Sequence, residues 1–117
     1  MSKELNSSNP VRNVRWNERA AIVEVVGDID INRSNEFQQA LLAVLDEKPE
    51  RVIVHLGAVP YMDSSGVASL VKLLSRARKA GTKVFLVQLG DRVRSIFEIT
   101  RLDNVFTIFR TEAEALV

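Results

Sequence analysis

Short apolar runs with strand character alternate with amphipathic stretches from residue 20 onward, and this alternation limits the fold more than any other feature. The β-branched run at 51–56 and the run at 83–88 both have the composition of buried strands. Apolar residues at helical spacing form two stripes, one of Phe37, Ala40, Leu41, Val44 and Leu45 and one of Val67, Leu70, Val71, Leu74 and Ala77. The sequence therefore predicts an α/β fold, with a mixed, mostly parallel central sheet of about four to five strands and about four helices.

The N-terminal part of the chain predicts a hairpin. Val14 and Trp16 alternate with Arg15, as in a strand with one exposed face, and a turn at 17–19 leads into a second run at 20–26. Residues 1–10 are polar and end at Pro10, so we expect them to be disordered. No linker interrupts the rest, and the prediction is one domain over residues 11–117.

Polar residues mark the starts of three expected helices, which are Asn32 or Ser34, then Asp63 or Ser64, then Asp91. Gly81 stands where a left-handed C-terminal cap is favoured. The last elements expected are a short strand at 105–109 and a short helix opened by the capping-box pattern at 111–114.

Composition excludes several classes of function. The chain has no cysteine, which rules out disulfides, thiolate metal sites and cysteine nucleophiles, and no other metal-ligand set stands out. Its 16 basic and 15 acidic residues give a formal charge of +1, so we expect neither nucleic acid nor a membrane as partner. The N-terminus lacks the apolar run of a signal peptide, and no stretch approaches the ~20 apolar residues of a membrane span. The expectation is a cytoplasmic protein.

The segment at 59–66 contains the candidate functional residues. It follows a predicted buried strand and opens a predicted helix, which is where α/β sheets tend to place their sites. Asp63, Ser64 and Ser65 could each cap that helix, and Gly66 allows another backbone to approach its first turn closely. A phosphate on a serine here would be tolerated by the helix dipole. The residues alone favour a plain helix cap over a modification or binding site, and both interpretations stay open.

Three segments in series resemble the STAS domain. They are Gly27-Asp-Ile-Asp30, Tyr61-Met-Asp-Ser-Ser-Gly66, and the stretch 93–102 followed by Val105-Phe106. In order and spacing they are similar to bacterial anti-sigma factor antagonists, over about residues 11–117. The sequence departs from the family pattern at Val59-Pro-Tyr61, where the family varies, and at Thr100-Arg101-Leu102, where a glycine before the leucine is frequent.

The resemblance implies a partner switch without a cofactor. In that family the unphosphorylated protein binds an anti-sigma factor, itself a serine kinase, and so frees the sigma factor. The kinase phosphorylates the first serine of the Asp-Ser-Ser-Gly motif, here Ser64 with Ser65 as second choice, and a PP2C-type phosphatase reverses the mark. Asp30 matches the family aspartate near the acceptor, and Asp63 matches the motif aspartate. We expect a monomer or weak dimer and a partner surface of Asp28, Asp30, Asp63, Ser64, Ser65, Gly66, Ala68, Lys72 and Arg76.

Alternatives of other kinds remain. The chain contains the residue types of a hydrolase triad in His55, Ser64 and Asp63. However, His55 lies in an apolar strand, and no Gly-x-Ser-x-Gly elbow is present. A weak phosphate- or nucleotide-binding enzyme is a second alternative, but it lacks a Gly-x-x-x-x-Gly-Lys loop. Within the resemblance, the chain could serve as a scaffold of a stress-signalling assembly or as an accessory subunit of a lipid-transport ABC complex.

Overall fold

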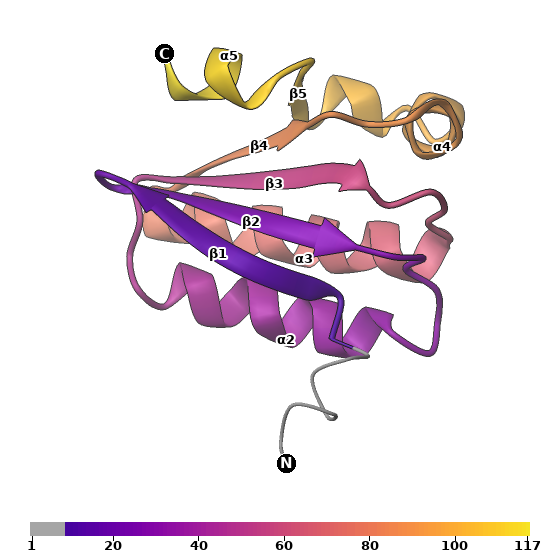
Figure 1. Ribbon diagram of the computed structural model, residues 1–117, viewed down its shortest axis with the longest axis horizontal. Coiled ribbons are helices and arrows are strands. Elements are labelled where there is room, and N and C mark those ends of the chain that lie inside the picture. Colours follow the sequence, from indigo (N-terminus) through magenta and orange to yellow (C-terminus); the bar gives the residue numbers. More distant parts are fainter. Residues whose placement is uncertain (1–8) are drawn as a thin grey trace.

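The computed structural model describes residues 9–117 and arranges five strands in one sheet, in the order β1-β2-β3-β4-β5 (Figure 1). The strands are β1 (Val11–Asn17), β2 (Ala20–Val26), β3 (Arg51–Ala58), β4 (Lys83–Val87) and β5 (Thr107–Phe109). The first pair is antiparallel and the other three pairs are parallel. The predicted hairpin and the predicted mixed, mostly parallel sheet are confirmed.

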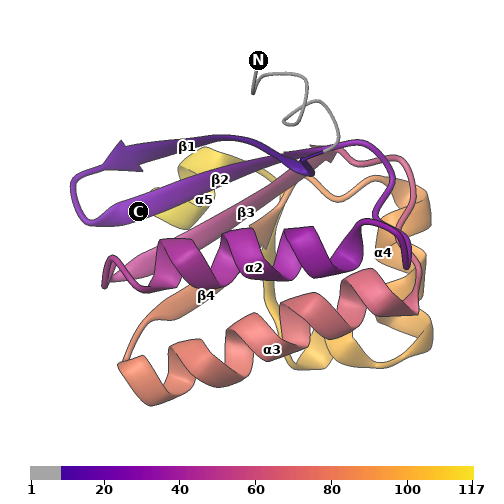
Figure 2. The same ribbon diagram turned by 90° about the horizontal axis from the view of Figure 1, so that it is seen from below.

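Helices cover both faces of this sheet. The helices α2 (Ser34–Leu45) and α3 (Ser64–Ala80) lie side by side across one face, as Figure 2 shows, while the short α5 (Glu112–Leu116) packs on the other. The helix α4 (Asp91–Ile99) and the 3₁₀ turn η1 (Leu102–Asn104) lie at the end of the sheet where α3 begins (Figure 1). Within residues 9–117 no helix is long and apolar enough to cross a bilayer.

The central strands are covered on both faces, which explains why apolar residues occupy successive positions in them. Successive residues point to opposite sides of a strand, so Val23 and Val54 pack against α2 and α3 while Ile22 and Ile53 pack under α5. Because α5 is short, the core on its side is much smaller than the core on the other side.

The start of the described chain joins the sheet by a backbone hydrogen bond, and its last helix begins with a side-chain cap. Pro10 is buried, and its carbonyl accepts a hydrogen bond of 2.8 Å from the Val26 N–H. The remainder of the expected disordered segment, residues 1–8, lies outside the described residues. At the other end, the Thr111 hydroxyl and the Glu114 carboxylate form the predicted capping box of α5.

Two predicted helix caps are wrong. The helix α4 has Gly90 as its N-cap, and Asp91 is its first residue, because the chain turns into the helix one residue earlier than expected. Neither Asn32 nor Ser34 caps α2, whose N-cap residue is Arg33 and has no side-chain cap bond. The caps of α3 are as predicted, with Asp63 at its start and Gly81, at φ 77°, at its end.

The predicted apolar stripe of α3 is partly wrong. Val71 is 40% exposed, whereas Leu73, which the stripe omitted, is fully buried. The helix packs against α2 on one side and the sheet on the other, so its buried arc is rotated toward Leu73 and includes Ser69. The Ser69 hydroxyl donates to the Ser34 carbonyl at 3.0 Å, which fixes the start of α2 against α3.

The predicted strand at 105–109 begins two residues later. The turn η1 intervenes, and the N–H groups of Val105 and Phe106 both donate to the Leu102 carbonyl at 2.9 Å. Val105 is 44% exposed, whereas the buried Phe106 packs edge to face on Phe97 at 5.5 Å between ring centroids. Burial of the Phe106 ring fixes the turn η1 in place, and the strand β5 therefore starts only at Thr107.

Candidate functional site

The loops that follow β2 and β3 meet at one end of the sheet (Figure 1, right). Ile29 forms an isolated parallel bridge with Met62, in which the Ile29 N–H donates to Tyr61 and the Asp63 N–H donates to Ile29, both at 3.0 Å. Ile29 and Met62 are buried. The bridge therefore places the expected site residues Asp28 and Asp30 beside the start of α3.

Asp63 is the N-cap of α3, and its carboxylate is the centre of the hydrogen bonding there. Its Oδ1 accepts from the Ser65 N–H at 2.9 Å, the Ser65 hydroxyl at 2.5 Å and the Gly66 N–H at 3.4 Å. These bonds, that of the Ser65 hydroxyl first, hold the pKa of Asp63 below its ordinary value against the opposing effect of burial. The site thus holds a fixed negative charge.

The two adjacent serines differ in their surroundings. Ser65 is half-buried, and its hydroxyl donates a hydrogen bond to the Asp63 carboxylate. Ser64 is exposed, and within residues 9–117 its hydroxyl makes no hydrogen bond. A reagent that approaches the start of α3 therefore meets the Ser64 hydroxyl first.

Gly66 allows α3 to start close to the bridged loops. A Cβ at this position would lie 2.6 Å from Cγ of Met62 and 2.8 Å from Cγ2 of Ile29. Real Cβ atoms do not approach other atoms so closely, so the close approach expected for this glycine is present in the structure.

The acidic residues before α2 are only partly available to a partner. Asp28 is exposed, and its carbonyl accepts from Nη1 of Arg33 at 2.6 Å. Asp30 is half-buried, and its carboxylate accepts from the Asn32 N–H at 3.0 Å. Asp28 therefore presents its carboxylate to solvent, whereas Asp30 also stabilises the turn into α2.

The rest of the expected surface follows one stripe of α3. Ala68, Lys72 and Arg76 are exposed and succeed Ser64 at intervals of four residues, which places them on the same side of the helix. At a rise of about 1.5 Å per residue, Arg76 lies about 18 Å from Ser64 along the helix axis. A partner that covers every expected residue must therefore lie along most of α3.

A groove beside Ser64 contains residues that the sequence analysis missed. It has a volume of about 350 Å³ and is lined from the start of α3 by Tyr61, Met62, Asp63 and Ser64 and from α4 by Arg92, Ser95, Ile96 and Ile99. The Arg92 guanidinium lies over the Tyr61 ring, 5.4 Å from its centroid. The one sequence signal for this groove was Ile99, an apolar residue outside the buried stripe of α4, which is 80% exposed.

The residues of the hydrolase triad are not assembled. His55 lies opposite Glu24 in the β2–β3 pairing, and its Nδ1 accepts a hydrogen bond of 3.2 Å from the Gly57 N–H. Among residues 9–117 it makes no hydrogen bond to Asp63 or Ser64. Asp63 instead binds Ser65, so no base is positioned to activate the Ser64 hydroxyl.

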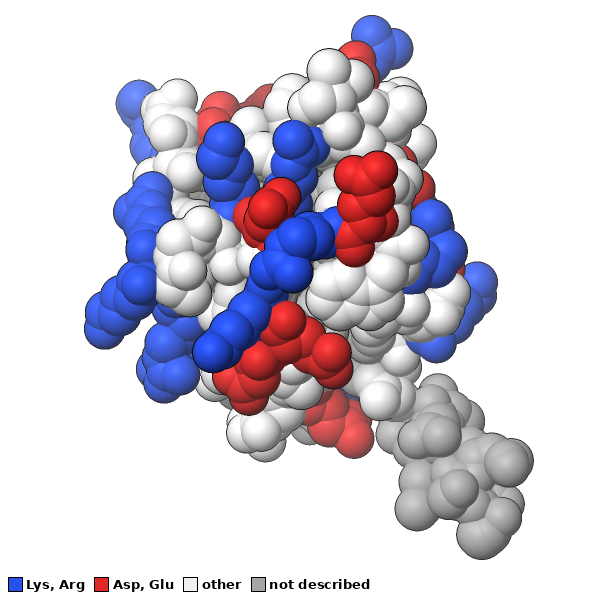
Figure 3. Space-filling view, turned by 90° about the vertical axis from the view of Figure 1, so that its left-hand side faces the viewer, with Lys and Arg blue, Asp and Glu red and all other residues white. Residues whose placement is uncertain are grey.

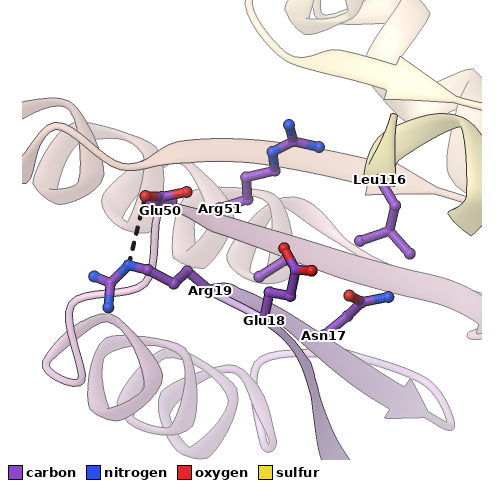
Figure 4. Close-up of a pocket in the computed structure, with 7 residues that line it drawn as sticks. Asn17, Glu18, Arg19, Glu50, Arg51 and Leu116 are labelled. Atoms are coloured by element: carbon purple, nitrogen blue, oxygen red, sulfur yellow. Dashed lines mark ion pairs between the residues drawn. The ribbon is translucent and has the colours of Figure 1, made fainter.

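The opposite end of the sheet has a smaller hollow of about 100 Å³ (Figure 4). Arg19 forms an ion pair with Glu50 at 3.5 Å and donates to the Lys48 carbonyl at 2.6 Å, while Arg51 donates to the Ala115 carbonyl at 2.8 Å. Basic and acidic side chains stand side by side over this end of the molecule (Figure 3). These charges tie the hairpin turn and α5 to the strand ends, a structural role.

Comparison with known proteins finds the same fold and the same family. A structure of a putative anti-sigma factor antagonist from Thermotoga maritima superimposes with a TM-score of 0.85 at 19% identity, covering 95% of each chain. An anti-sigma factor antagonist from Mycobacterium paratuberculosis gives a TM-score of 0.82 at 27% identity, over 89% of this chain and 88% of that one. The anti-sigma-B factor antagonist of Staphylococcus aureus is 27% identical over 86 residues, which are 74% of this chain and 80% of the relative. The family model of the STAS domain matches residues 12–115, and the chain therefore belongs to the STAS domain family.

Proposed function

We propose that this protein is an anti-sigma factor antagonist that binds an anti-sigma factor serine kinase in the cytoplasm and releases it when Ser64 is phosphorylated. The similarity to the anti-sigma factor antagonists of Staphylococcus aureus and Mycobacterium paratuberculosis supports the antagonist role. The protein itself acts by binding, without a cofactor and without catalysing a reaction. It does so as a monomer or weak dimer.

One observation carries the choice of Ser64 as the acceptor. Its hydroxyl is exposed and unbonded within residues 9–117, whereas the hydroxyl of Ser65 is held by Asp63. Phosphorylation of Ser65 would first have to break that bond and would place the phosphate against a carboxylate. Ser64 needs no such rearrangement.

The modification follows ordinary phosphoryl-transfer chemistry. Ser64 Oγ forms a bond to the γ-phosphorus of ATP, the bond from that phosphorus to the β–γ bridging oxygen breaks, and ADP leaves. The hydroxyl proton passes to a base of the kinase, since the Asp63 carboxylate beside Ser64 is hydrogen-bonded to Ser65 and Gly66 instead. Reversal by a PP2C-type phosphatase uses water and releases inorganic phosphate.

Phosphorylation should weaken binding and leave the fold intact. A phosphoserine adds about −1.5 to −2 charges at pH 7, here next to the anionic Asp63 and the exposed carboxylate of Asp28. Inside an interface that charge must lose its hydration and is repelled by any acidic group of the partner. On the free protein it lies at the exposed, positive end of the α3 dipole, which tolerates it.

The test compares partner capture by the wild type, Ser64→Ala, Ser64→Asp and a charge control. Gln39→Glu is the control, because it adds one negative charge on an exposed position of α2. Wild type, Ser64→Ala and the control should retain a small ATP-binding serine kinase from native lysate. Ser64→Asp should bind the purified kinase at least about tenfold more weakly, a difference of about 1.4 kcal/mol.

The same kinase should add one phosphate from ATP to the wild type and none to Ser64→Ala. The proposal is wrong if Ser64→Asp binds the kinase as tightly as the wild type. Capture of ABC-transporter subunits by all four proteins, with Ser64 never modified, would instead support the accessory-subunit alternative. Capture of a multi-protein stress-signalling assembly, with affinity independent of residue 64, would support the scaffold.

A further inference from the structure

We propose that the groove between the start of α3 and α4 is a phosphate-binding site of the modified protein, in which Arg92 binds the phosphate on Ser64. The inference rests on the proposed function for the modification itself. It adds an intramolecular ligand, from a part of the chain 28 positions away, that the motif at residues 63–66 does not contain.

Ser64 and Arg92 line the same groove. Ser64 comes from the first turn of α3 and Arg92 from the first turn of α4, so both lie on helices whose positions are set by the core. Ser95, one turn further along α4, also lines the groove. A phosphate on Ser64 Oγ would therefore enter a space that already contains a cation and a hydrogen-bond donor.

The Arg92 guanidinium is available to bind a phosphate. Among residues 9–117 the Arg92 side chain forms no ion pair and no hydrogen bond, and its guanidinium lies over the Tyr61 ring, 5.4 Å from the centroid. By contrast, the nearby Arg33 donates to the carbonyls of Asp28 and Val26. A cation–π contact at an exposed site is weaker than the paired hydrogen bonds of a guanidinium to a phosphate. Arg92 should therefore leave Tyr61 when the phosphate is present.

Neither Asp63 nor Lys72 is placed to bind the phosphate in the groove. Among residues 9–117, Asp63 is the only other ionisable side chain besides Tyr61 and Arg92 that lines the groove, and its bonds to Ser65 and Gly66 keep it anionic. It repels a phosphate and so favours a position toward α4. Lys72, on the same helix as Ser64, lies about 12 Å further along the axis, with its side chain exposed.

Binding of the phosphate by Arg92 would change the surface around Ser64 in a second way, in addition to the added negative charge. In the unmodified protein, the groove beside Ser64 exposes the Arg92 guanidinium, which lies over the Tyr61 ring. The exposed Ile99 lines the same groove. In the phosphorylated protein, Arg92 would be paired with the phosphate and unavailable to an acidic group of a partner. Phosphorylation would thus remove one favourable contact while it introduces an unfavourable one.

The test uses protein with phosphoserine installed at residue 64 during translation by codon reassignment, so that no kinase is needed. The ³¹P resonance is titrated with pH in the wild-type background, in Arg92→Gln and in Arg94→Gln. Arg94 is the matched control, because it lies on the same helix and does not line the groove. A bound guanidinium stabilises the dianion, so the second pKa of the phosphate should lie below its usual value of about 6 in the wild type and in Arg94→Gln.

In Arg92→Gln that pKa should rise by about one unit, and Arg92→Lys should give an intermediate value because it keeps the charge without the paired donors. In the wild type, phosphorylation should also shift the Nε–Hε signal of Arg92. The proposal is overturned if Arg92→Gln and Arg94→Gln titrate alike. Because the phosphate is installed without the kinase, this failure is distinguishable from a failure of the partner-binding test above.

Discussion

The Ser65 hydroxyl donates a hydrogen bond of 2.5 Å to Oδ1 of Asp63, and this contact separates the roles of two neighbouring serines. One serine completes the N-terminal cap of α3. The other, Ser64, keeps a free hydroxyl in solvent. The motif Asp63-Ser-Ser-Gly66 therefore contains one serine that takes part in the helix cap and one whose hydroxyl is exposed and unbonded within residues 9–117.

Replacing the two serines one at a time should separate these roles. Ser65→Ala removes a hydrogen bond to a half-buried carboxylate and should lower the free energy of unfolding by about 1–2 kcal/mol. Ser64→Ala removes an exposed, unbonded hydroxyl and should change it by less than about 0.5 kcal/mol. Urea unfolding at pH 7 measures both. Equal losses for the two variants would contradict the division of roles.

Asp63 should make the stability of the protein depend on pH in the acidic range. Its pKa is lower in the folded protein than in the unfolded chain, chiefly because it accepts from the Ser65 hydroxyl. The unfolded chain therefore binds more protons near the ordinary aspartate pKa of about 3.9, and stability rises with pH there. The contribution is complete above that value and is lost as the pH falls through the lowered pKa of the folded state.

Asp63→Asn is the matched variant, since asparagine caps helices as well as aspartate does but does not titrate. Its unfolding free energy should decline less steeply than that of the wild type between about pH 5 and pH 2. The two proteins are compared by urea unfolding at a series of pH values. Parallel curves would show that the Asp63 carboxylate does not contribute to acid sensitivity.

Local patterns in the sequence were enough to predict the order of strands and helices. The apolar cores of the strands β3 and β4, at 52–54 and 84–87, pack against helices on both faces of the sheet, so their apolar character is easy to identify. Asp63 and Gly81 cap α3 through local contacts, which depend on residues close in sequence. Local patterns alone favoured Ser64 and Ser65 as helix-cap residues, and it was the resemblance of the motif at residues 63–66 to the STAS family that named them as phosphorylation candidates.

Features that depend on tertiary packing could not be predicted. Val71 and Leu73 are equally apolar, and only the position of α2 beside α3 decides that Leu73 is the buried one. Arg92 reaches the groove because α4 lies across the end of the sheet, a placement that no spacing in the sequence encodes. Likewise, the burial of Phe106 against Phe97 displaces the start of β5.

Gly66→Ala should destabilise the protein even though alanine favours helices over glycine. The added methyl group would lie 2.6 Å from Cγ of Met62 and 2.8 Å from Cγ2 of Ile29, and both side chains are buried. Overpacking of this kind typically lowers the free energy of unfolding by about 1–3 kcal/mol. Gly90→Ala is the control, because its methyl group would meet nothing within 4 Å. A Gly66→Ala variant as stable as the control would contradict the close approach.

Arg15 joins α5 to the sheet, and breaking this link should loosen the helix. It bonds Glu24 on β2 at 2.6 Å and both carboxylate oxygens of Glu112 on α5, at 2.6 and 3.1 Å. The bond from Arg15 is the main reason that the pKa of Glu112 is lowered. Because α5 has only five residues, it cannot be stable without such tertiary contacts.

Glu112→Gln should therefore lower the free energy of unfolding by about 0.5–1 kcal/mol, a modest value because both side chains are partly in water. The loss relative to wild type should shrink in 1 M salt, where screening acts over about 3 Å. Glu98→Gln is the control, since Glu98 is exposed and forms no ion pair among residues 9–117. Hydrogen exchange should show faster opening of the α5 amides in Glu112→Gln alone. If the two variants have equal stability and equal exchange at both salt concentrations, α5 is held by Ala115 and its apolar neighbours rather than by Arg15.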